Sequence, residues 1–184
     1  MKWQWRNSSV RYGWLSAGLH WFMLILLIAV YASMELREFY PKGSAPREAM
    51  KTWHYMLGLT VLALTVVRLA VAFVGPAPAI SPRPTKWISR AASLMKLALY
   101  LLMICMPLLG WLLLSAKGNV IPFFGLHLAP LINENKAFAG SIKELHETVA
   151  VAGYFLIGAH AAAALYHHFL VRDDTLRRIL PPTD

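Results

Sequence analysis

Four long apolar stretches constrain the fold of this chain more than any other feature of its sequence. They occupy 13–34, 53–74, 93–115 and 146–170, and each contains about the 20 residues that a helix needs to cross about 30 Å of hydrocarbon. Because 58% of the residues are hydrophobic and 15% are charged, the chain is too apolar for a typical soluble domain. We therefore expect an all-α, integral membrane four-helix bundle that forms a single domain over 1–184.

The connections between these stretches contain residues that end helices. Segment 35–52 is polar and includes Pro41, Gly43 and Pro46, and segment 75–84 contains four prolines. Segment 117–145 is too polar to cross the bilayer, although 120–132 is apolar enough to form a short helix at the interface. The first apolar stretch has the length of a span rather than that of a cleaved signal peptide, so we expect it to cross the membrane.

The distribution of Lys and Arg predicts the orientation of the bundle. With four spans both termini lie on one side of the membrane, and that side, which includes Lys2, carries eleven basic residues against seven on the other. The terminal side has three acidic residues, Asp184 among them, and the other side has six. By the positive-inside rule, both termini are expected in the cytoplasm. The basic residues flank apolar stretches, which favours contact with membrane lipid and not with nucleic acid.

Histidines inside the apolar stretches are the candidate functional residues, because an intramembrane histidine is costly unless it has a partner. His146 and His160 are 14 residues apart in the fourth span, which is about 21 Å of helix and nearly four turns, so they share a face. His54 begins the second span, at the same membrane side as His146. His20 lies 14 residues before the end of the first span, at the depth of His160. The depths therefore pair His54 with His146 and His20 with His160.

Two facing histidine pairs at two depths suit two six-coordinate, b-type haems, because each iron takes two axial ligands. Zinc would need further ligands, and no cysteine or carboxylate lies at a suitable helical spacing. Arg68 follows His54 by 14 residues, so its cation lies at the depth of the inner pair, His20 and His160, where it could bind a haem propionate. Gly153, midway between the two histidines of the fourth span, and Gly58 could let a macrocycle approach the backbone.

Several of these residues have other interpretations. The side chain of Arg68 could instead extend to the membrane interface and place its charge in water. Gly58 and Gly153 could simply allow close packing of helices. His127 and His168 are interpreted as interfacial residues. His167 lies seven residues after His160, so it is a candidate substitute ligand, a hydrogen-bond partner for a quinone, or an interfacial residue.

Several segments resemble the bacterial cytochrome b561 family, and the resemblance covers nearly the whole chain. It is most specific in the fourth span, where HET at 146–148 precedes GYFLIG at 153–158 and HAAAAL at 160–165. The other matching segments are LHW at 19–21, ASMELR at 32–37, VVRL at 66–69 and HH at 167–168.

The resemblance implies two haem b groups, with the same histidine pairs that the depths indicate, in a multi-pass protein of the bacterial inner membrane. Family members also have histidines early in the third span, where this chain has SLMK at 93–96. The role of those positions, near the cytoplasmic-side quinone, is therefore not carried over to this chain.

Small dihaem members of the family oxidise superoxide to dioxygen at the periplasmic face and pass the electrons to ubiquinone. The resemblance implies the same superoxide:ubiquinone oxidoreductase activity here. No catalytic residue is assigned, because superoxide gives up its electron without losing a proton. Basic residues of the outer connections could steer the anion, and ordinary loop charge is the alternative. The candidates are Arg37, Lys42, Lys51 and Lys117, with Arg47, Lys136 and Lys143 nearby.

Two other functions remain open at this point. The chain could be a haem b electron-transfer subunit that anchors a dehydrogenase or hydrogenase partner and relays its electrons to quinone. It could also be a haem-free helical membrane protein whose histidines line an ion path.

Overall fold

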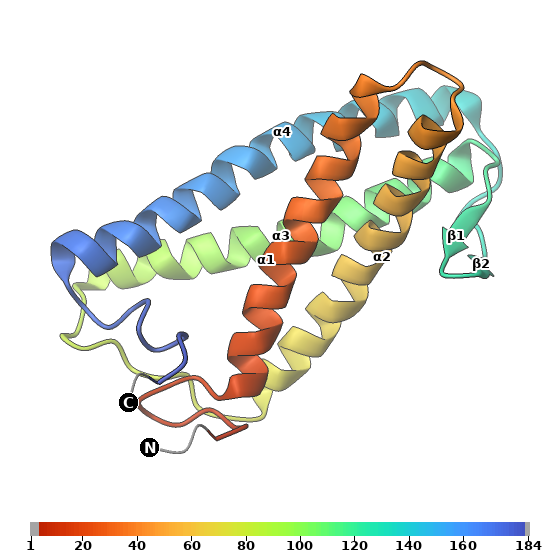
Figure 1. The fold of residues 1–184 in the computed structure, drawn as a ribbon. Helices are drawn as coiled ribbons and strands as arrows, with labels where there is room; N and C mark the ends of the chain where they lie inside the picture. Colours follow the sequence, from red (N-terminus) through yellow and green to blue (C-terminus); the bar gives the residue numbers. More distant parts are fainter. Residues whose placement is uncertain (1–3, 183–184) are drawn as a thin grey trace. The chain divides into compact units, whose positions relative to one another are not determined.

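The computed structural model describes residues 4–182, and it is mostly helical (Figure 1). Lys2 and Asp184, which enter the charge balance, lie outside the described residues. Within them, four helices are long and apolar enough to cross a membrane. These are α1 (Trp14–Leu36), α2 (Ala45–Phe73), α3 (Lys86–Ala116) and α4 (Lys136–Tyr166). The prediction of a helical membrane protein with four spans is confirmed.

Helices α2, α3 and α4 begin before the apolar stretches that predict them, whereas α1 begins at Trp14, one residue after position 13. Helix α2 begins eight residues before position 53, so Pro46 lies in its first turn, where the missing N–H costs no helical hydrogen bond. Helix α4 begins ten residues before position 146, and the side chain of Asn135 caps it by accepting a hydrogen bond from the Phe138 N–H at 3.1 Å. The apolar pattern marks the part of a helix that suits hydrocarbon, and the polar turns continue the same helix outside it.

Segment 117–135 contains a β-hairpin, so the prediction of a short interfacial helix at 120–132 is wrong. Strands β1 (Ile121–Phe123) and β2 (Leu126–Leu128) pair antiparallel. The two turn residues, Phe124 and Gly125, have φ angles of 46° and 85°, and positive φ at both central positions is typical of a tight hairpin turn. Ile121 is buried in a hydrophobic cluster with Leu59 and Leu114, and this burial holds β1 against α2 and α3.

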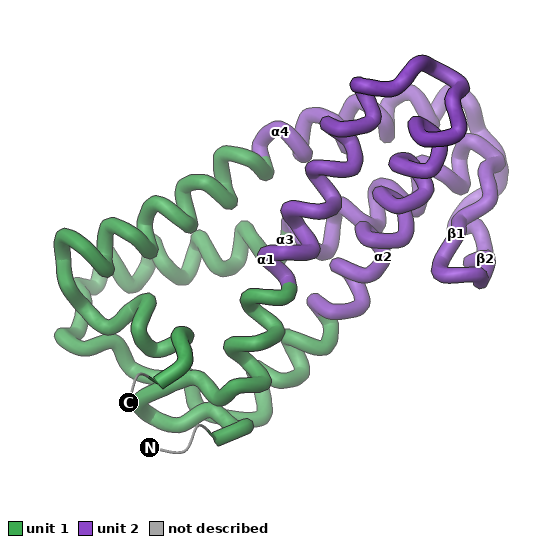
Figure 2. The backbone as a smooth tube through the Cα atoms, viewed as in Figure 1, with its two compact units in different colours: residues 1–22, 66–101, 153–184 green, residues 23–65, 102–152 purple. Residues whose placement is uncertain are grey.

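The chain forms two compact units, shown in green and purple in Figure 2. Unit 1 comprises 1–22, 66–101 and 153–184, and unit 2 comprises 23–65 and 102–152. Every long helix contributes one segment to each unit. Unit 1 also contains both terminal segments and the α2–α3 connection, whereas unit 2 contains the other two connections.

In unit 1, hydrogen bonds join the N-terminal segment, the α2–α3 connection and the C-terminal segment, which all lie outside the long helices. Arg178 is 7% exposed and donates a hydrogen bond to the Pro78 carbonyl. The guanidinium of Arg11 donates to the carbonyl oxygens of residues 177 and 180, at 3.0 and 3.1 Å. The backbone N–H of Ser81 donates to the carboxylate of Asp174 at 2.9 Å. The C-terminal segment is thereby tied to the N-terminal segment and to the α2–α3 connection.

Candidate functional site

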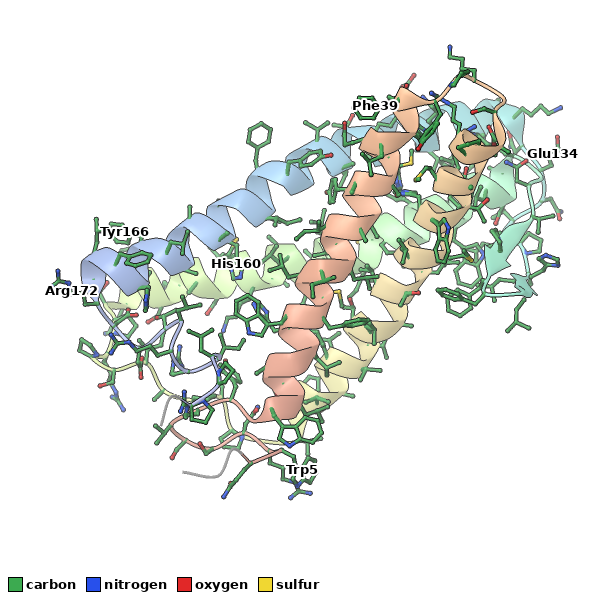
Figure 3. All side chains as sticks on the ribbon, in the orientation of Figure 1. Trp5, Phe39, Glu134, His160, Tyr166 and Arg172 are labelled. Carbon is green, nitrogen blue, oxygen red and sulfur yellow. The ribbon has the colours of Figure 1, made fainter. Side chains whose placement is uncertain are left out.

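The first candidate site lies in unit 1, between α1 and α4. His20 on α1 faces His160 on α4, which is labelled in Figure 3. Their ring centroids are 6.3 Å apart and their planes are 70° from one another. We call these two residues the unit 1 pair.

The second candidate site lies in unit 2, between α2 and α4. Here the ring centroids of His54 and His146 are 6.2 Å apart, with an angle of 76° between the planes. We call these residues the unit 2 pair. The structure thus brings together the same partners that helix depth predicts from the sequence. It places His160, and not His167, opposite His20.

The spacing within each pair leaves room for one metal ion between the rings. Metal–imidazole nitrogen bonds are about 2 Å long, and each ring centroid lies about 1 Å behind its nitrogen, so two imidazoles on opposite sides of one ion have centroids about 6 Å apart. No three metal-binding side chains are grouped anywhere in 4–182. A metal ion at either pair would therefore take its remaining ligands from a cofactor, which suits the ring nitrogens of haem.

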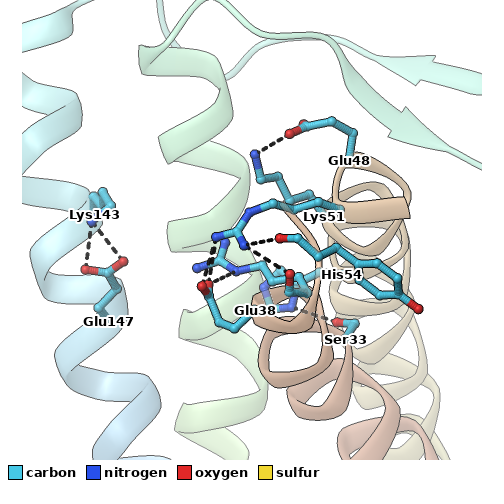
Figure 4. Close-up of polar contacts among 10 residues, drawn as sticks. Ser33, Glu38, Glu48, Lys51, His54, Lys143 and Glu147 are labelled. Atoms are coloured by element: carbon cyan, nitrogen blue, oxygen red, sulfur yellow. Dashed lines mark hydrogen bonds and ion pairs between the residues drawn. The ribbon is translucent and has the colours of Figure 1, made fainter. Parts of the chain in front are cut away.

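His54 is oriented by two residues of α1. Its Nδ1 atom donates to the Val30 carbonyl oxygen at 3.1 Å, because a carbonyl can only accept. The Ser33 hydroxyl donates to the same carbonyl at 2.6 Å and lies 3.4 Å from Nδ1 (Figure 4). With the proton on Nδ1, the Nε2 atom is free to bind a metal, which is the usual arrangement of a metal-binding histidine.

His146 is packed against a glycine that sequence reasoning missed. A Cβ atom at Gly110 on α3 would lie 3.4 Å from Cε1 and 3.9 Å from Nδ1 of His146. The Nδ1 atom itself is buried and has no hydrogen-bond partner within 4–182. A glycine inside an apolar stretch can allow another helix to approach closely, and this was the signal in the sequence that could have pointed to Gly110.

Arg68, predicted at the depth of the inner pair, lies in contact with the unit 1 pair. Its Nη2 atom is 3.5 Å from Nδ1 of His20. Trp21, the next residue on α1, stands edge to face with His20 at 5.3 Å and donates from its indole N–H to the Ile179 carbonyl. His20 is therefore in contact with a cation and with an aromatic ring, and the C-terminal segment holds that ring.

The two glycines predicted at the sites differ in their surroundings. Gly153 is buried in α4. At Gly58 an added Cβ would have no atom of residues 4–182 within 4 Å apart from the backbone of its own helix, so helix packing does not require a glycine there and the backbone is open to a ligand or to lipid.

The remaining histidines lie apart from the two pairs. His167 begins a π-helical turn (His167–Val171), and its Nδ1 atom is 2.6 Å from the carboxylate of Asp173. Burial raises the pKa of Asp173, but hydrogen bonds from His167 and Thr175 outweigh it and hold the pKa below its usual range. His127 is exposed on β2. The buried Nδ1 atom of His168 has no partner in the part of the chain described.

The candidate steering cations of unit 2 fall into two groups. Arg37 and Lys51 form ion pairs with Glu38 and Glu48, at 2.9 and 2.7 Å. Lys42 and Lys117 are exposed and form no ion pair with any residue between 4 and 182.

Arg47, by contrast, has a structural role. It is 8% exposed, donates to the carbonyl oxygens of Arg37 and Tyr40, and binds Glu38, so it closes the α1–α2 connection (Figure 4). Lys136 and Lys143 are paired with Glu134 and Glu147.

Comparison with known proteins identifies relatives along nearly the whole chain. Cytochrome b561 homolog 1 of Escherichia coli is 42% identical over 89% of this chain and 93% of its own length. The probable superoxide oxidase CybB of Yersinia pestis is 36% identical over 93% of this chain and 96% of its own length. Cytochrome b561 homolog 2 of Escherichia coli is 30% identical over 95% of this chain and 93% of its own length. The family described as prokaryotic cytochrome b561 matches residues 11–182. The chain therefore belongs to the prokaryotic cytochrome b561 family of multi-pass bacterial membrane proteins that bind haem b.

Proposed function

We propose that this protein is a superoxide:ubiquinone oxidoreductase that holds two haem b groups. The observation that carries the proposal is the presence of two opposed histidine pairs, one in each unit, with centroid separations of 6.2 and 6.3 Å. The reaction is proposed from the 36% identity to a relative named as a probable superoxide oxidase. The relative with 42% identity has a name that states no reaction.

The axial ligands in this proposal are His20 and His160 for one haem and His54 and His146 for the other. The geometry supports Nε2 as the iron-binding atom of His54, because the Val30 carbonyl takes the proton on Nδ1. Arg68 is the proposed partner of a haem propionate near the unit 1 pair, and Gly153 is the proposed position at which a macrocycle approaches the backbone of α4.

The proposed topology puts both termini in the cytoplasm and the α1–α2 and α3–α4 connections in the periplasm, with the protein in the bacterial inner membrane. Superoxide would then meet the unit 2 end first. Lys42 and Lys117 form no ion pair with any of the described residues, so their charge is available to attract an anion. The positive-inside count and the shared unit of the two termini support this orientation.

Haem supplies a carrier that accepts and releases one electron at a time. Each superoxide gives up one electron and leaves as dioxygen, with no proton to remove. One ubiquinone takes two electrons and two protons to become the quinol, so two superoxide ions are consumed for each quinone. The protein residues bind the cofactors, attract the anion and exclude water from the electron path.

Stopped-flow spectroscopy of the purified protein with bound haem tests this proposal. Superoxide should reduce the haem, superoxide dismutase should abolish that reduction, and ubiquinone should then reoxidise the haem. Reduction that persists unchanged in the presence of the dismutase would reject superoxide as the donor. A dehydrogenase or hydrogenase that co-purifies stably and reduces the haem would favour the electron-transfer subunit instead.

The haem stoichiometry tests the ligand assignment separately. A pyridine haemochrome assay should give two haem b per chain, and His20→Ala and His54→Ala should each remove one haem and spare the other. Folded protein without haem b would leave the ion-path alternative.

A further inference from the structure

The two histidine pairs differ in the charge beside them. The guanidinium of Arg68 lies 3.5 Å from Nδ1 of His20, inside the hydrophobic part of α2. Arg68 forms no ion pair with any carboxylate between 4 and 182. Arginine stays protonated at any physiological pH, so this is a fixed positive charge next to the unit 1 pair.

The unit 2 pair has a different neighbour, a hydrogen-bond acceptor. The Nδ1–H of His54 donates to the Val30 carbonyl at 3.1 Å. Two charged side chains near this pair, Arg37 and Glu147, each form an ion pair. Arg37 is paired with Glu38, and Glu147 on α4 is paired with Lys143 at 2.9 Å (Figure 4).

These two environments act in opposite directions on an iron bound between the rings. A carbonyl that accepts from Nδ1–H makes the imidazole a stronger electron donor to the metal, and this favours the oxidised iron. A cation beside the other imidazole favours the reduced iron, because adding an electron removes one unit of positive charge. Low polarity around both sites strengthens each effect.

We propose that Arg68, together with the Val30 carbonyl, sets the direction of electron transfer inside the protein. The inference rests on the proposed binding of one haem at each pair. With one haem at each pair, an electron passed between them would oxidise the haem held by His54 and His146 and reduce the haem held by His20 and His160. No proton or other reactant is needed for this step. The charge asymmetry makes the transfer favourable in this direction.

The sign of the effect is the same if Arg68 binds a haem propionate. In that case the arginine neutralises a negative charge at the unit 1 haem, and its removal leaves that negative charge uncompensated. The reduced iron would again be disfavoured. A merely structural role for Arg68 predicts no change in redox equilibrium while both haems remain bound.

Potentiometric titration of the holoprotein, followed by visible spectroscopy, tests the proposal without superoxide or quinone. The two midpoints are assigned with His20→Ala, which should leave the unit 2 haem, and His54→Ala, which should leave the unit 1 haem. We expect the unit 1 haem to be the better electron acceptor by at least about tenfold in equilibrium constant, or about 59 mV for one electron. Equal midpoints, or the reverse order, would overturn the inference.

Arg68→Gln and Arg68→Lys provide the second measurement. Arg68→Gln should lower the midpoint of the unit 1 haem and leave that of the unit 2 haem unchanged. Arg68→Lys keeps the charge, so it should retain most of the difference between the two midpoints that the unchanged protein shows. Arg83→Gln removes a cation from the exposed α2–α3 connection of the same unit and is the matched control, with no expected shift.

The outcomes separate this inference from the proposed function. Two bound haems with no response of the unit 1 midpoint to Arg68→Gln would reject the role of Arg68 and leave superoxide oxidation untouched. A protein that fails to react with superoxide but shows the expected midpoints would reject the proposed function alone. If Arg68→Gln does not fold, the order of the two midpoints in the unchanged protein still decides the question.

Discussion

Gly110 on α3 lies directly against His146 on α4, so that a Cβ at position 110 would come within 3.4 Å of the imidazole. This distance is an ordinary van der Waals contact, so a Cβ fits there, but a branched side chain would compete with the imidazole for the same space. The absence of a side chain at Gly110 therefore helps to determine where the imidazole of the unit 2 pair can lie.

If each pair holds one haem, as proposed, Gly110→Leu should displace His146 and reduce the haem content from two to one per chain, with the unit 2 haem lost. Gly110→Ala should keep both haems, because its Cβ needs no movement of the neighbour. The measurement is a pyridine haemochrome assay on each purified variant. Gly140→Leu, on an exposed face of α4 with no atom near its added Cβ, is the control and should keep both haems. Two haems in Gly110→Leu would contradict the prediction.

The near-perpendicular histidine rings should be visible in the electron paramagnetic resonance spectrum of the oxidised protein. Ring planes at 70° and 76° leave two iron d orbitals close in energy, since each imidazole raises a different one. Both low-spin ferric haems are therefore expected to give a signal dominated by one large g value. Well-separated rhombic g values at both haems would mean that the ligand planes are close to parallel.

Lys42 and Lys117 should determine how fast the anion reaches the protein. Each of Lys42→Glu and Lys117→Glu should slow haem reduction by superoxide about threefold at low ionic strength, because both cations are exposed and form no ion pair within 4–182. The difference should shrink at high salt, which screens exposed charges. Stopped-flow rates at two salt concentrations provide the measurement, with Arg83→Glu in unit 1 as the control. Unchanged rates at low salt would exclude steering by these lysines.

The ionised form of Asp173 should stabilise the end of unit 1. The carboxylate is 2.6 Å from His167 and accepts from the Thr175 N–H at 2.9 Å. Asp173→Asn should lower the free energy of unfolding by about 1–2 kcal/mol near neutral pH, because a hydrogen bond to a charged group becomes a neutral one. Denaturation in detergent micelles measures the difference.

The pH dependence of this contribution follows from the lowered pKa of Asp173. Its pKa in the unfolded chain is about 3.9, so the stabilisation by the carboxylate is complete above that value. It is lost as the pH falls through the lower pKa of the folded state. The gap between the wild type and Asp173→Asn should therefore narrow on acidification below about pH 4. A gap that widens on acidification would contradict the assignment.

The histidine pairs could be predicted because their positions follow from regular geometry. On one continuous helix, the 14-residue spacing from His146 to His160 determines both the depth and the face of each ring. The partners on α1 and α2 then follow from the direction in which each span crosses the membrane. The same reasoning predicted Arg68 close to the unit 1 pair, where the structure has it beside His20.

Other features depend on contacts that no periodicity encodes. The hairpin at 121–128 was missed because a short run of apolar residues suits a helix or a strand equally, and its turn residues decide between them. Gly110 was missed because its neighbour comes from another helix. The pairing of Arg37 with Glu38 and of Lys51 with Glu48 depends on side-chain conformations, so the sequence could not show which cations stay free.

The division of the chain between the two units has a consequence for biosynthesis. All residues of unit 2 have been translated once position 152 is reached, whereas unit 1 still lacks the half of α4 that contains His160 and the final segment that contains Arg178. On a ribosome the pair His54 and His146 is therefore available before its counterpart. A chain that ends near position 155 would therefore contain both histidines of the unit 2 pair but lack His160 of the unit 1 pair.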